Sequence, residues 1–307
     1  GILDAAGNGV DLQQYPLYPD ALAQAFAPLA HFVTLAGLAP YSVPERRGEL
    51  KSVMVTVSPD SELMVRFVMR STEALARIRK HLPWLEEAIP GLAVASLNVL
   101  PEHKAVPEGE REIPLTEQEH LTMRVNGIPL SLRPQSFFQT NTEVAAALYR
   151  QVAAWVDAVR PASVWDLYCG VGGFALHCAG PGRDVVGVEV SGEAVASARA
   201  TASGLVRQGV PGAERLQFIH ADAVQWAASS HAAPELVVVN PPRRGIGKEL
   251  ATWLETSTAS HVIYSSCNPQ TLKLDLEAMP SLRPVHARVL DMFPHTEHCE
   301  VAVLLSR

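Results

Sequence analysis

The stretch DLYCGVGGFA, residues 166–175, lies between two short apolar runs, one that begins at Ser163 and VVGVEV at residues 185–190. Its three glycines stand between an expected strand and an expected helix, where the backbone can approach a ligand closely and helix N–H groups point at that ligand. Glu189 lies near the end of the second run, sixteen residues after Gly173, where a carboxylate can accept hydrogen bonds from ribose hydroxyls. The stretch therefore predicts a nucleotide-type cofactor at the carboxyl end of a parallel sheet.

Short β-rich runs and helical stretches alternate around this turn. The β-rich runs cover residues 163–166, 185–190, 216–220, 236–239 and 261–265, and helical patterns cover residues 192–205, 223–228, 248–257 and 269–279. Strands that alternate with helices of this length form βαβ units and a parallel sheet covered on both faces. The last two runs, 285–290 and 301–305, have no helical pattern between them, so we expect an antiparallel pair at the sheet edge.

The first 130 residues have a different pattern, which predicts a smaller α+β domain. Residues 20–36 and 72–87 have helical periodicity, residues 52–57 and 63–69 read as a hairpin, and Asn126-Gly127 is a strong hairpin-turn signal. The Pro- and Glu-rich segment 101–112 is expected to be an exposed loop. We therefore predict an accessory α+β domain over residues 1–130 and an α/β domain over residues 131–307.

Composition and charge exclude several classes of protein. The 307 residues are 48% hydrophobic and 19% charged, which rules out a disordered chain. The net charge, 25 − 32 = −7, argues against indiscriminate coating of nucleic acid but leaves room for a local basic groove. None of the four cysteines is spaced C-x-x-C, so a reducing cytoplasm is expected and a zinc site has no local support. No apolar stretch reaches the roughly 20 residues of a membrane span, and residues 1–4 have neither the charge of a secretory signal nor an initial Met.

The glycine turn alone leaves two cofactors open. Gly170-x-Gly172-x-x-Ala175 also satisfies the dinucleotide fingerprint, so a nicotinamide oxidoreductase is an alternative. The segment NPPRRGIG, residues 240–247, favours a methyltransferase, because base-modifying methyltransferases use an [Asp/Asn]-Pro-Pro-x turn at the end of this strand. An aromatic fourth residue would indicate methylation of an adenine or cytosine amine, whereas this chain has Arg243.

Two further segments carry candidate chemistry. In SSCNPQT, residues 265–271, Cys267 stands before a helix that Asn268 would cap and Pro269 would open, and the positive helix end would lower the thiol pKa. In DMFPHTEHCE, residues 291–300, Glu300 opens the last strand and can point back to the ligand crevice. His295 and His298 lack a convincing third ligand, so no metal is expected.

These four segments and SFFQTN at residues 136–141 occur in the order typical of the RNA 5-methyluridine methyltransferases, and the sequence resembles that family. The resemblance covers nearly the whole chain and includes PLYP at 16–19, RGELK at 47–51 and LTEQ at 115–118. Asn240, where the tRNA branch has Asp, and RGIG at 244–247 favour the bacterial 23S rRNA branch.

The resemblance implies a class I methyltransferase with a Rossmann-like sheet, S-adenosylmethionine as cofactor and a 23S rRNA uridine of the position-747 type as substrate. It implies that Cys267 is the nucleophile, which forms a covalent adduct at C6, and that Glu300 is the base for the C5 proton. The positions that correspond to the cofactor site are Gln139, Tyr168, Gly170, Glu189 and Asn240. Phe137, which would stack on the flipped uracil, and Arg243 correspond to substrate positions.

The resemblance also sets expectations for partners. RNA is the expected partner of a monomer with no membrane association, and the candidate phosphate contacts are Arg46, Arg47, Lys51, Arg77, Arg79 and Lys80. Family members carry a four-cysteine iron–sulfur site, but Gln14-Tyr15 stands where one cysteine precedes the PLYP segment, so no cluster is expected here. A tRNA or other rRNA site is the alternative substrate, and an oxidoreductase or an inactive RNA-binding subunit is the alternative class.

Overall fold

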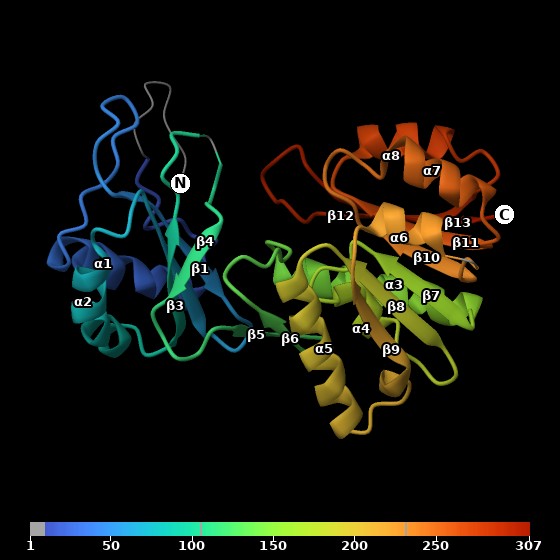
Figure 1. Cartoon of the computed structure of the whole chain (residues 1–307), viewed down its shortest axis with the longest axis horizontal. Helices are drawn as coiled ribbons and strands as arrows, with labels where there is room; N and C mark the ends of the chain where they lie inside the picture. The colour runs from blue at the N-terminus through green and yellow to red at the C-terminus, as the bar shows by residue number, and fades with distance from the viewer. Residues whose placement is uncertain (1–9, 105, 231) are drawn as a thin grey trace. The chain divides into compact units, whose positions relative to one another are not determined.

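The computed structural model describes residues 10–104, 106–230 and 232–307, and the chain divides into two compact units, Gly1–Thr122 and Met123–Arg307 (Figure 1). The chain start at residues 1–4, in which no secretory signal was found, lies outside the described residues. Among the described residues, no helix combines the length and the apolar character that crossing a membrane requires.

The second unit is built on a seven-stranded sheet in the order β12-β13-β11-β10-β7-β8-β9. The strands are β7 Ser163–Leu167, β8 Asp184–Glu189, β9 Leu216–His220, β10 Leu236–Val239, β11 His261–Ser266, β12 Arg283–Leu290 and β13 Glu300–Ser306. β7 to β11 are parallel, and β13 runs antiparallel to both β11 and β12. The predicted parallel sheet with an antiparallel C-terminal edge pair is therefore confirmed.

Helices cover both faces of this sheet (Figure 1). The helices are α3 Thr142–Val159, α4 Gly173–His177, α5 Gly192–Arg207, α6 Ala223–Ser229, α7 Gly247–Thr256 and α8 Pro269–Glu277. Side chains of α6, α7 and α8 form one apolar core with inward residues of the strands, and α3, α4 and α5 lie on the other face. The sequence analysis did not identify α3, although Asn141 caps it and Leu148, Val152 and Val156 recur at helical spacing on its buried face.

The hairpin of β5 Leu121–Val125 and β6 Ile128–Leu132 corrects the predicted domain boundary at residues 130/131. Its turn is the predicted Asn126-Gly127, and both residues have positive φ, +50° and +84°, as a tight two-residue hairpin requires. The hairpin packs with the second unit: Leu130 is fully buried, and the Thr201 hydroxyl on α5 donates to the Pro129 carbonyl at 3.3 Å. The division between the two units therefore falls inside β5, between Thr122 and Met123. The hairpin buries its apolar side chains, which stabilises its packing with the second unit.

The first unit is an α+β layer. Its sheet has the order β1-β2-β3-β4, with β2 and β3 parallel and the other two pairs antiparallel. The elements are α1 Asp20–Leu35, β1 Leu50–Val57, β2 Leu63–Met69, α2 Leu75–Ala88, β3 Leu92–Val99 and β4 Arg111–Pro114. Alternate β2 residues, Val65 and Phe67 among them, share a core with Phe32 of α1 and Ile78 of α2.

Most described residues of the segment 101–112 are exposed, as predicted, but its last residue is not. Glu112 lies in β4, and its side chain, which is only 14% exposed, accepts two hydrogen bonds from the Arg66 guanidinium, at 3.1 and 2.7 Å. Ser96 and Asn98 of β3 donate to the same carboxylate. Burial alone would raise the pKa of Glu112, but these donors outweigh burial and hold its pKa below the ordinary value. The ion pair fastens the segment to the sheet, which no local sequence pattern indicates.

Candidate active site

The candidate residues gather at one edge of the seven-stranded sheet. β11, β10, β7 and β8 are neighbours and parallel, so their carboxyl ends lie along the same edge. β13 runs the other way and begins at that edge with Glu300. Ser266, the last residue of β11, pairs with Val301, the second residue of β13, so Cys267 and Glu300 both directly adjoin this pair. Antiparallel pairing thus brings together two residues that are 33 positions apart in the chain (300 − 267).

Glu300 is a buried carboxyl group with two hydrogen-bond donors on one oxygen. Glu300 is only 2% exposed. Its Oε1 accepts one hydrogen bond from the Ser265 hydroxyl at 2.5 Å and one from the Asn240 amide at 3.3 Å. Burial raises the pKa of Glu300, and the two hydrogen bonds oppose that rise without cancelling it. A carboxylate with a raised pKa is suited to accept a proton in catalysis. Among the described residues, the side-chain hydrogen bonds of Glu300 go to Ser265 and Asn240 and not to His295 or His298 in the loop before it.

Asn240 lies where β10 ends and the NPPRRGIG segment begins, as predicted. The turn that follows is held to α8: the Asn268 amide and the Thr271 hydroxyl both donate to the Arg243 carbonyl, at 3.1 and 3.2 Å. The Arg243 side chain itself is exposed, so it is free to meet a substrate. The backbone of this turn is therefore fixed to the helix that follows Cys267.

A second contact fixes the rest of the segment. Asp275 of α8 is buried, and its Oδ2 accepts from the Ile246 N–H at 3.0 Å and from the Tyr264 hydroxyl at 2.6 Å. Gly245 has φ +81°, and a Cβ there would lie 2.3 Å from Asp275 Oδ2. Glycine is therefore required for this approach.

Cys267 occupies the short connection from β11 to α8 and is half-buried. Asn268 caps α8 by accepting from the Gln270 N–H, and Pro269 follows at the first helical position, as the sequence predicted. The Ser266 hydroxyl accepts from the Asn268 N–H at 3.1 Å, which closes a tight turn around Cys267. The thiol is therefore held on a rigid connection between the strand and the helix.

The glycine turn provides the second part of the site. Tyr168 has φ +69°, an uncommon conformation for a residue with a bulky side chain, and Gly170 follows with φ +53°. The Glu189 carboxylate accepts the Gly170 N–H at 3.0 Å and the Ser191 N–H at 2.9 Å. Glu189 thus supports the turn and retains lone pairs for ribose hydroxyls, the role expected of it.

The turn fits a bound nucleotide-type cofactor. A Cβ built on Gly170 would meet nothing within 4 Å, so there is open space over the backbone at this position, whereas a Cβ on Gly173 would lie 2.5 Å from the Tyr149 hydroxyl. The turn therefore packs against Tyr149 of α3 at Gly173 and is open at Gly170. Of the predicted cofactor residues, Tyr168 and Gly170 lie on this turn, and Glu189 at the end of β8 is hydrogen-bonded to it.

Asp166, the first residue of the DLYCGVGGFA segment, was not predicted to be a functional residue. It is fully buried at the end of β7, Oδ2 accepts the Ala175 N–H at 2.8 Å, and Oδ1 has no partner among the described residues. Burial, and to a lesser extent the charge of Glu189, raises the pKa of Asp166 to about 8. A charged residue among the apolar residues Val164, Trp165 and Leu167 is the sequence feature that could have identified it.

Gln139 and Phe137 precede α3, in the loop that Asn141 ends. Gln139 is buried at 9% exposure, whereas Phe137 is 74% exposed. A large exposed aromatic ring is a suitable surface for base stacking. No hydrogen bond or ring contact among the described residues joins Phe137 to Cys267 or Glu300, so its role stays a prediction.

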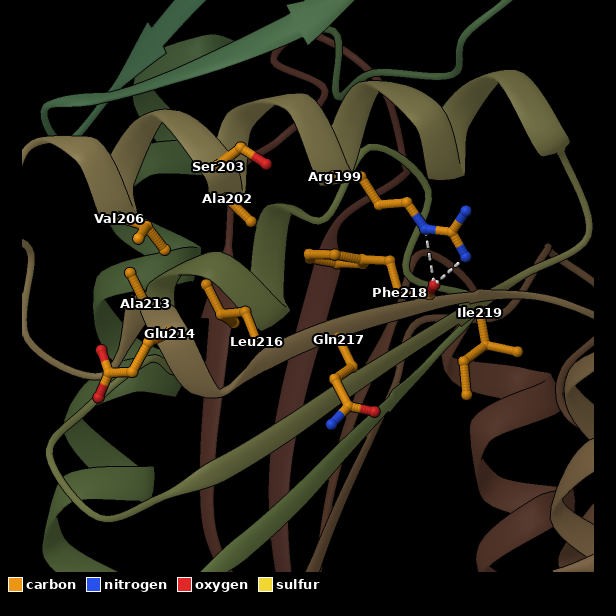
Figure 2. A pocket seen from close by; sticks show the side chains of 10 residues that line it. All are labelled: Arg199, Ala202, Ser203, Val206, Ala213, Glu214, Leu216, Gln217, Phe218 and Ile219. Atoms are coloured by element: carbon orange, nitrogen blue, oxygen red, sulfur yellow. Dashed lines mark hydrogen bonds between the residues drawn. The ribbon is translucent and has the colours of Figure 1, made fainter.

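Two other features are separate from this site. Within the described parts of the chain, no group of three or more His, Cys, Asp and Glu side chains is placed to hold a metal ion. A shallow hollow of about 560 Å³ lies between α5 and β9, at the far end of the sheet from β13 (Figure 2). There the Arg199 guanidinium donates twice to the Phe218 carbonyl, at 3.0 and 2.6 Å, so it occupies a backbone acceptor of the strand.

The basic side chains expected to contact RNA differ in availability. Arg77 donates to the Glu73 carboxylate and to the Ala36 carbonyl, so its guanidinium is already used within the first unit. The Lys51 ammonium donates to the Glu102 carbonyl and lies 5.1 Å from the centre of the Tyr41 ring. Tyr15, of the Gln14-Tyr15 pair, packs edge-on against Tyr18 with ring centres 5.4 Å apart.

Comparison with known proteins was made by sequence and by structure. A family described as tRNA (uracil-5-)-methyltransferase matches residues 215–307. The chain is 49% identical over 308 residues to the 23S rRNA (uracil(747)-C(5))-methyltransferase RlmC of Edwardsiella ictaluri, a match that covers 100% of this chain and 80% of that protein. The RlmC of an Escherichia coli O139:H28 strain is 48% identical, over 99% of this chain and 80% of the relative.

Solved structures show the same fold. The tRNA (uracil-54, C5)-methyltransferase of Pyrococcus abyssi in complex with S-adenosyl-L-homocysteine superposes with a TM-score of 0.80 at 25% identity, over 99% of this chain and 72% of that one. A complex of aTrm5 with tRNALeu superposes with a TM-score of 0.53 at 15% identity, over 84% of this chain and 72% of that one, and shows likeness of fold alone.

Proposed function

This chain belongs to the family of RNA (uracil-C5)-methyltransferases that includes RlmC, and from that membership we propose that it methylates C5 of a uridine in 23S rRNA, at the position-747 type of site. The cofactor is S-adenosylmethionine, which supplies an electrophilic methyl group when bound. The observation that carries the proposal is the buried Glu300 carboxyl group, which accepts a hydrogen bond from Asn240 and, like Cys267, directly adjoins the Ser266–Val301 strand pair.

The chain's own residues supply the steps that uracil cannot perform alone. Uracil C5 is a poor nucleophile, so the Cys267 thiolate adds to C6 and places electron density on C5. After the methyl group has been received, Glu300 takes the C5 proton, the C5–C6 double bond re-forms, and Cys267 leaves as a thiolate. Elimination restores both the aromatic base and the free thiolate.

The remaining residues bind and orient the reactants. Tyr168, Gly170 and Glu189 support the cofactor on the glycine turn, with Gln139 and Asn240 at its border. The target base must leave its stack to reach Cys267, and Phe137 would stack on it once flipped, with Arg243 nearby in the substrate site. The first unit supplies RNA contacts. Each of these roles is a proposal that rests on the family's motifs and on the positions given above.

The proposed enzyme works as a monomer in the cytoplasm. All of the proposed site residues come from one chain, so the reaction needs no second copy, and the four cysteines are free thiols, as in proteins of reducing compartments. Light scattering at the protein concentration of the activity assay measures the molar mass and so tests whether the enzyme is a monomer. A stable dimer that alone is active would contradict the proposal.

Transfer of tritium from labelled S-adenosylmethionine to 23S rRNA tests the function, with Cys267→Ala and Glu300→Gln as variants. Cys267→Ala is expected to bind the cofactor normally and transfer nothing, because the thiol acts on the base alone. Glu300→Gln is expected to stall as a covalent adduct with methylated RNA that survives denaturing electrophoresis. The adduct should disappear when both substitutions are combined. Normal turnover of Cys267→Ala would overturn the assignment of the nucleophile, and an active Glu300→Gln would overturn that of the base.

A further inference from the structure

We propose that Ser265 is a positioning residue for the base: its hydroxyl holds Glu300 Oε1, so that Oε2 is the oxygen that takes the proton from C5. This inference rests on the proposed function, in which Glu300 removes that proton. It assigns a role to a strand residue that stands two positions before the nucleophile.

The geometry gives Glu300 one preferred orientation. Ser265 is fully buried in β11, and its Oγ lies 2.5 Å from Glu300 Oε1. The Asn240 amide reaches the same oxygen from the end of β10, at 3.3 Å. Because the two donors come from different strands and converge on one atom, rotation of the carboxyl group would break both hydrogen bonds.

The second carboxyl oxygen, Glu300 Oε2, can accept the C5 proton. Among the residues that the structure describes, Glu300 Oε2 accepts no hydrogen bond, which makes it the available proton acceptor. In the elimination step the C5–H bond breaks and the proton goes to Oε2. The electron pair of that bond forms the C5–C6 double bond, and the C6–S bond breaks with its pair leaving on Cys267. The step is balanced without any further reactant.

The same hydrogen bond tunes the basicity of Glu300. Burial raises the pKa of this carboxyl group, and the Ser265 hydroxyl lowers it by stabilising the charged form. Among the described residues, Tyr149 on α3 is a titratable group whose pKa Glu300 helps to raise. Cys267 follows Ser266, whose partner Val301 is next to Glu300, and β12 pairs the apolar Leu290 with Glu300. Loss of Ser265 therefore raises the pKa of Glu300 further, and the base is protonated up to a higher pH.

The test is Ser265→Ala in the full chain, compared with Ser265→Thr and with a buried serine remote from the site. Ser197→Ala is the matched control, because Ser197 is similarly buried on α5 and its hydroxyl has no partner among the described residues. We expect Ser265→Ala to lower kcat about tenfold, the factor for a hydrogen bond to a charged group. The acid limb of its pH profile should move to higher pH, and covalent RNA adduct should accumulate. Affinity for S-adenosylmethionine should be unchanged, and Ser265→Thr should restore the profile.

The outcomes separate this inference from the proposed function. An inactive wild-type protein would refute the function itself, and an active Glu300→Gln would refute the role of Glu300 as the base, on which this inference rests. A Ser265→Ala variant with the wild-type pH profile and no adduct, beside a stalled Glu300→Gln, would overturn only the role of Ser265. If Ser265→Ala fails to bind the cofactor and is unfolded, Ser265→Cys keeps the volume with a weaker donor, and the same shift is expected of it. A normal profile for that variant would also overturn the inference.

Discussion

Both oxygens of the Glu189 carboxylate accept a backbone N–H, one from Gly170 in the glycine turn and one from Ser191 at the start of α5. A side chain that was expected only to bind ribose therefore also holds the shape of the turn. The two roles are compatible, because each carboxylate oxygen accepts more than one hydrogen bond. Cofactor affinity should then depend on Glu189 both directly and through the turn.

Glu189→Ala should weaken binding of S-adenosylmethionine by about 1–3 kcal/mol, the cost of leaving buried partners unpaired. Isothermal titration calorimetry gives the dissociation constant, and the circular dichroism spectrum controls for folding. Glu189→Gln is the matched control: it keeps one acceptor oxygen and should have an intermediate affinity. An unchanged dissociation constant in the alanine variant would show that the carboxylate supports neither the turn nor the ligand.

Asp166 should make the protein less stable as the pH rises. Its folded pKa, about 8, lies above the ordinary Asp value of about 3.9, so between those two pH values the folded state keeps a proton that the unfolded state has lost. The free energy of unfolding therefore falls with rising pH in this window and is unaffected by Asp166 below it. Urea titrations of wild type and Asp166→Asn at pH 5 and pH 7.5 should show a smaller loss of stability in the variant, which has no proton to lose. Equal losses in both proteins would show that Asp166 is ionised in the folded state.

At the scale of elements, α8 is the part that joins the two catalytic loops. The cap residue Asn268 and Thr271 in the first turn hold the Arg243 carbonyl, and Asp275 one turn later holds the Ile246 N–H. Cys267 lies immediately before the cap of the same helix. The distance between the nucleophile and the NPPRRGIG segment is therefore set by one short helix.

Asp275→Ala should destabilise the protein by about 2–5 kcal/mol, because it leaves two buried donors, the Ile246 N–H and the Tyr264 hydroxyl, without their acceptor. Denaturant unfolding followed by fluorescence gives this value. Tyr264→Phe removes one donor and leaves the Ile246 bond intact, so it should cost less than half as much. Equal costs for the two variants would mean that the Ile246 bond contributes nothing.

At the scale of the whole molecule, a chain of net charge −7 must bind an anionic RNA through local basic surfaces. The loop before β1 carries Arg46 and Arg47 in succession, and the bridge between Ser42 and Arg47 closes that loop. Gly48 allows its close return, since a Cβ there would lie within 2.1 Å of the Pro40 carbonyl oxygen. The two arginines are thus displayed on a constrained loop of the first unit.

Reversing these charges with Arg46→Glu and Arg47→Glu should weaken binding of 23S rRNA fragments and make binding less dependent on salt. The log–log slope should fall by roughly 0.7–0.9 for each phosphate that the protein no longer neutralises. Filter binding over a range of salt concentrations measures both quantities. Arg77→Ala is the control, because that guanidinium already bonds Glu73 and Ala36; it should lower the melting temperature and leave the slope unchanged. A slope unaffected by the two reversals would place the RNA contacts elsewhere.

The sequence by itself determined the parallel sheet, the antiparallel edge pair and the family. Glycine turns, strand periodicity and the Asn268-Pro269 helix start are local signals, and each acts through residues that are close together in the chain. The same signals placed Glu189, Asn240, Cys267 and Glu300 at strand ends.

Only the tertiary structure decided which of these groups touch. The bonds from Ser265 and Asn240 to Glu300 cross 35 and 60 positions of the chain, and their existence depends on strand order and register. The burial of Glu112 in the first unit and the packing of the 121–132 hairpin with the second unit were missed for the same reason. Burial and long-range hydrogen bonding are properties of packed surfaces, so a pattern read along the chain does not contain them.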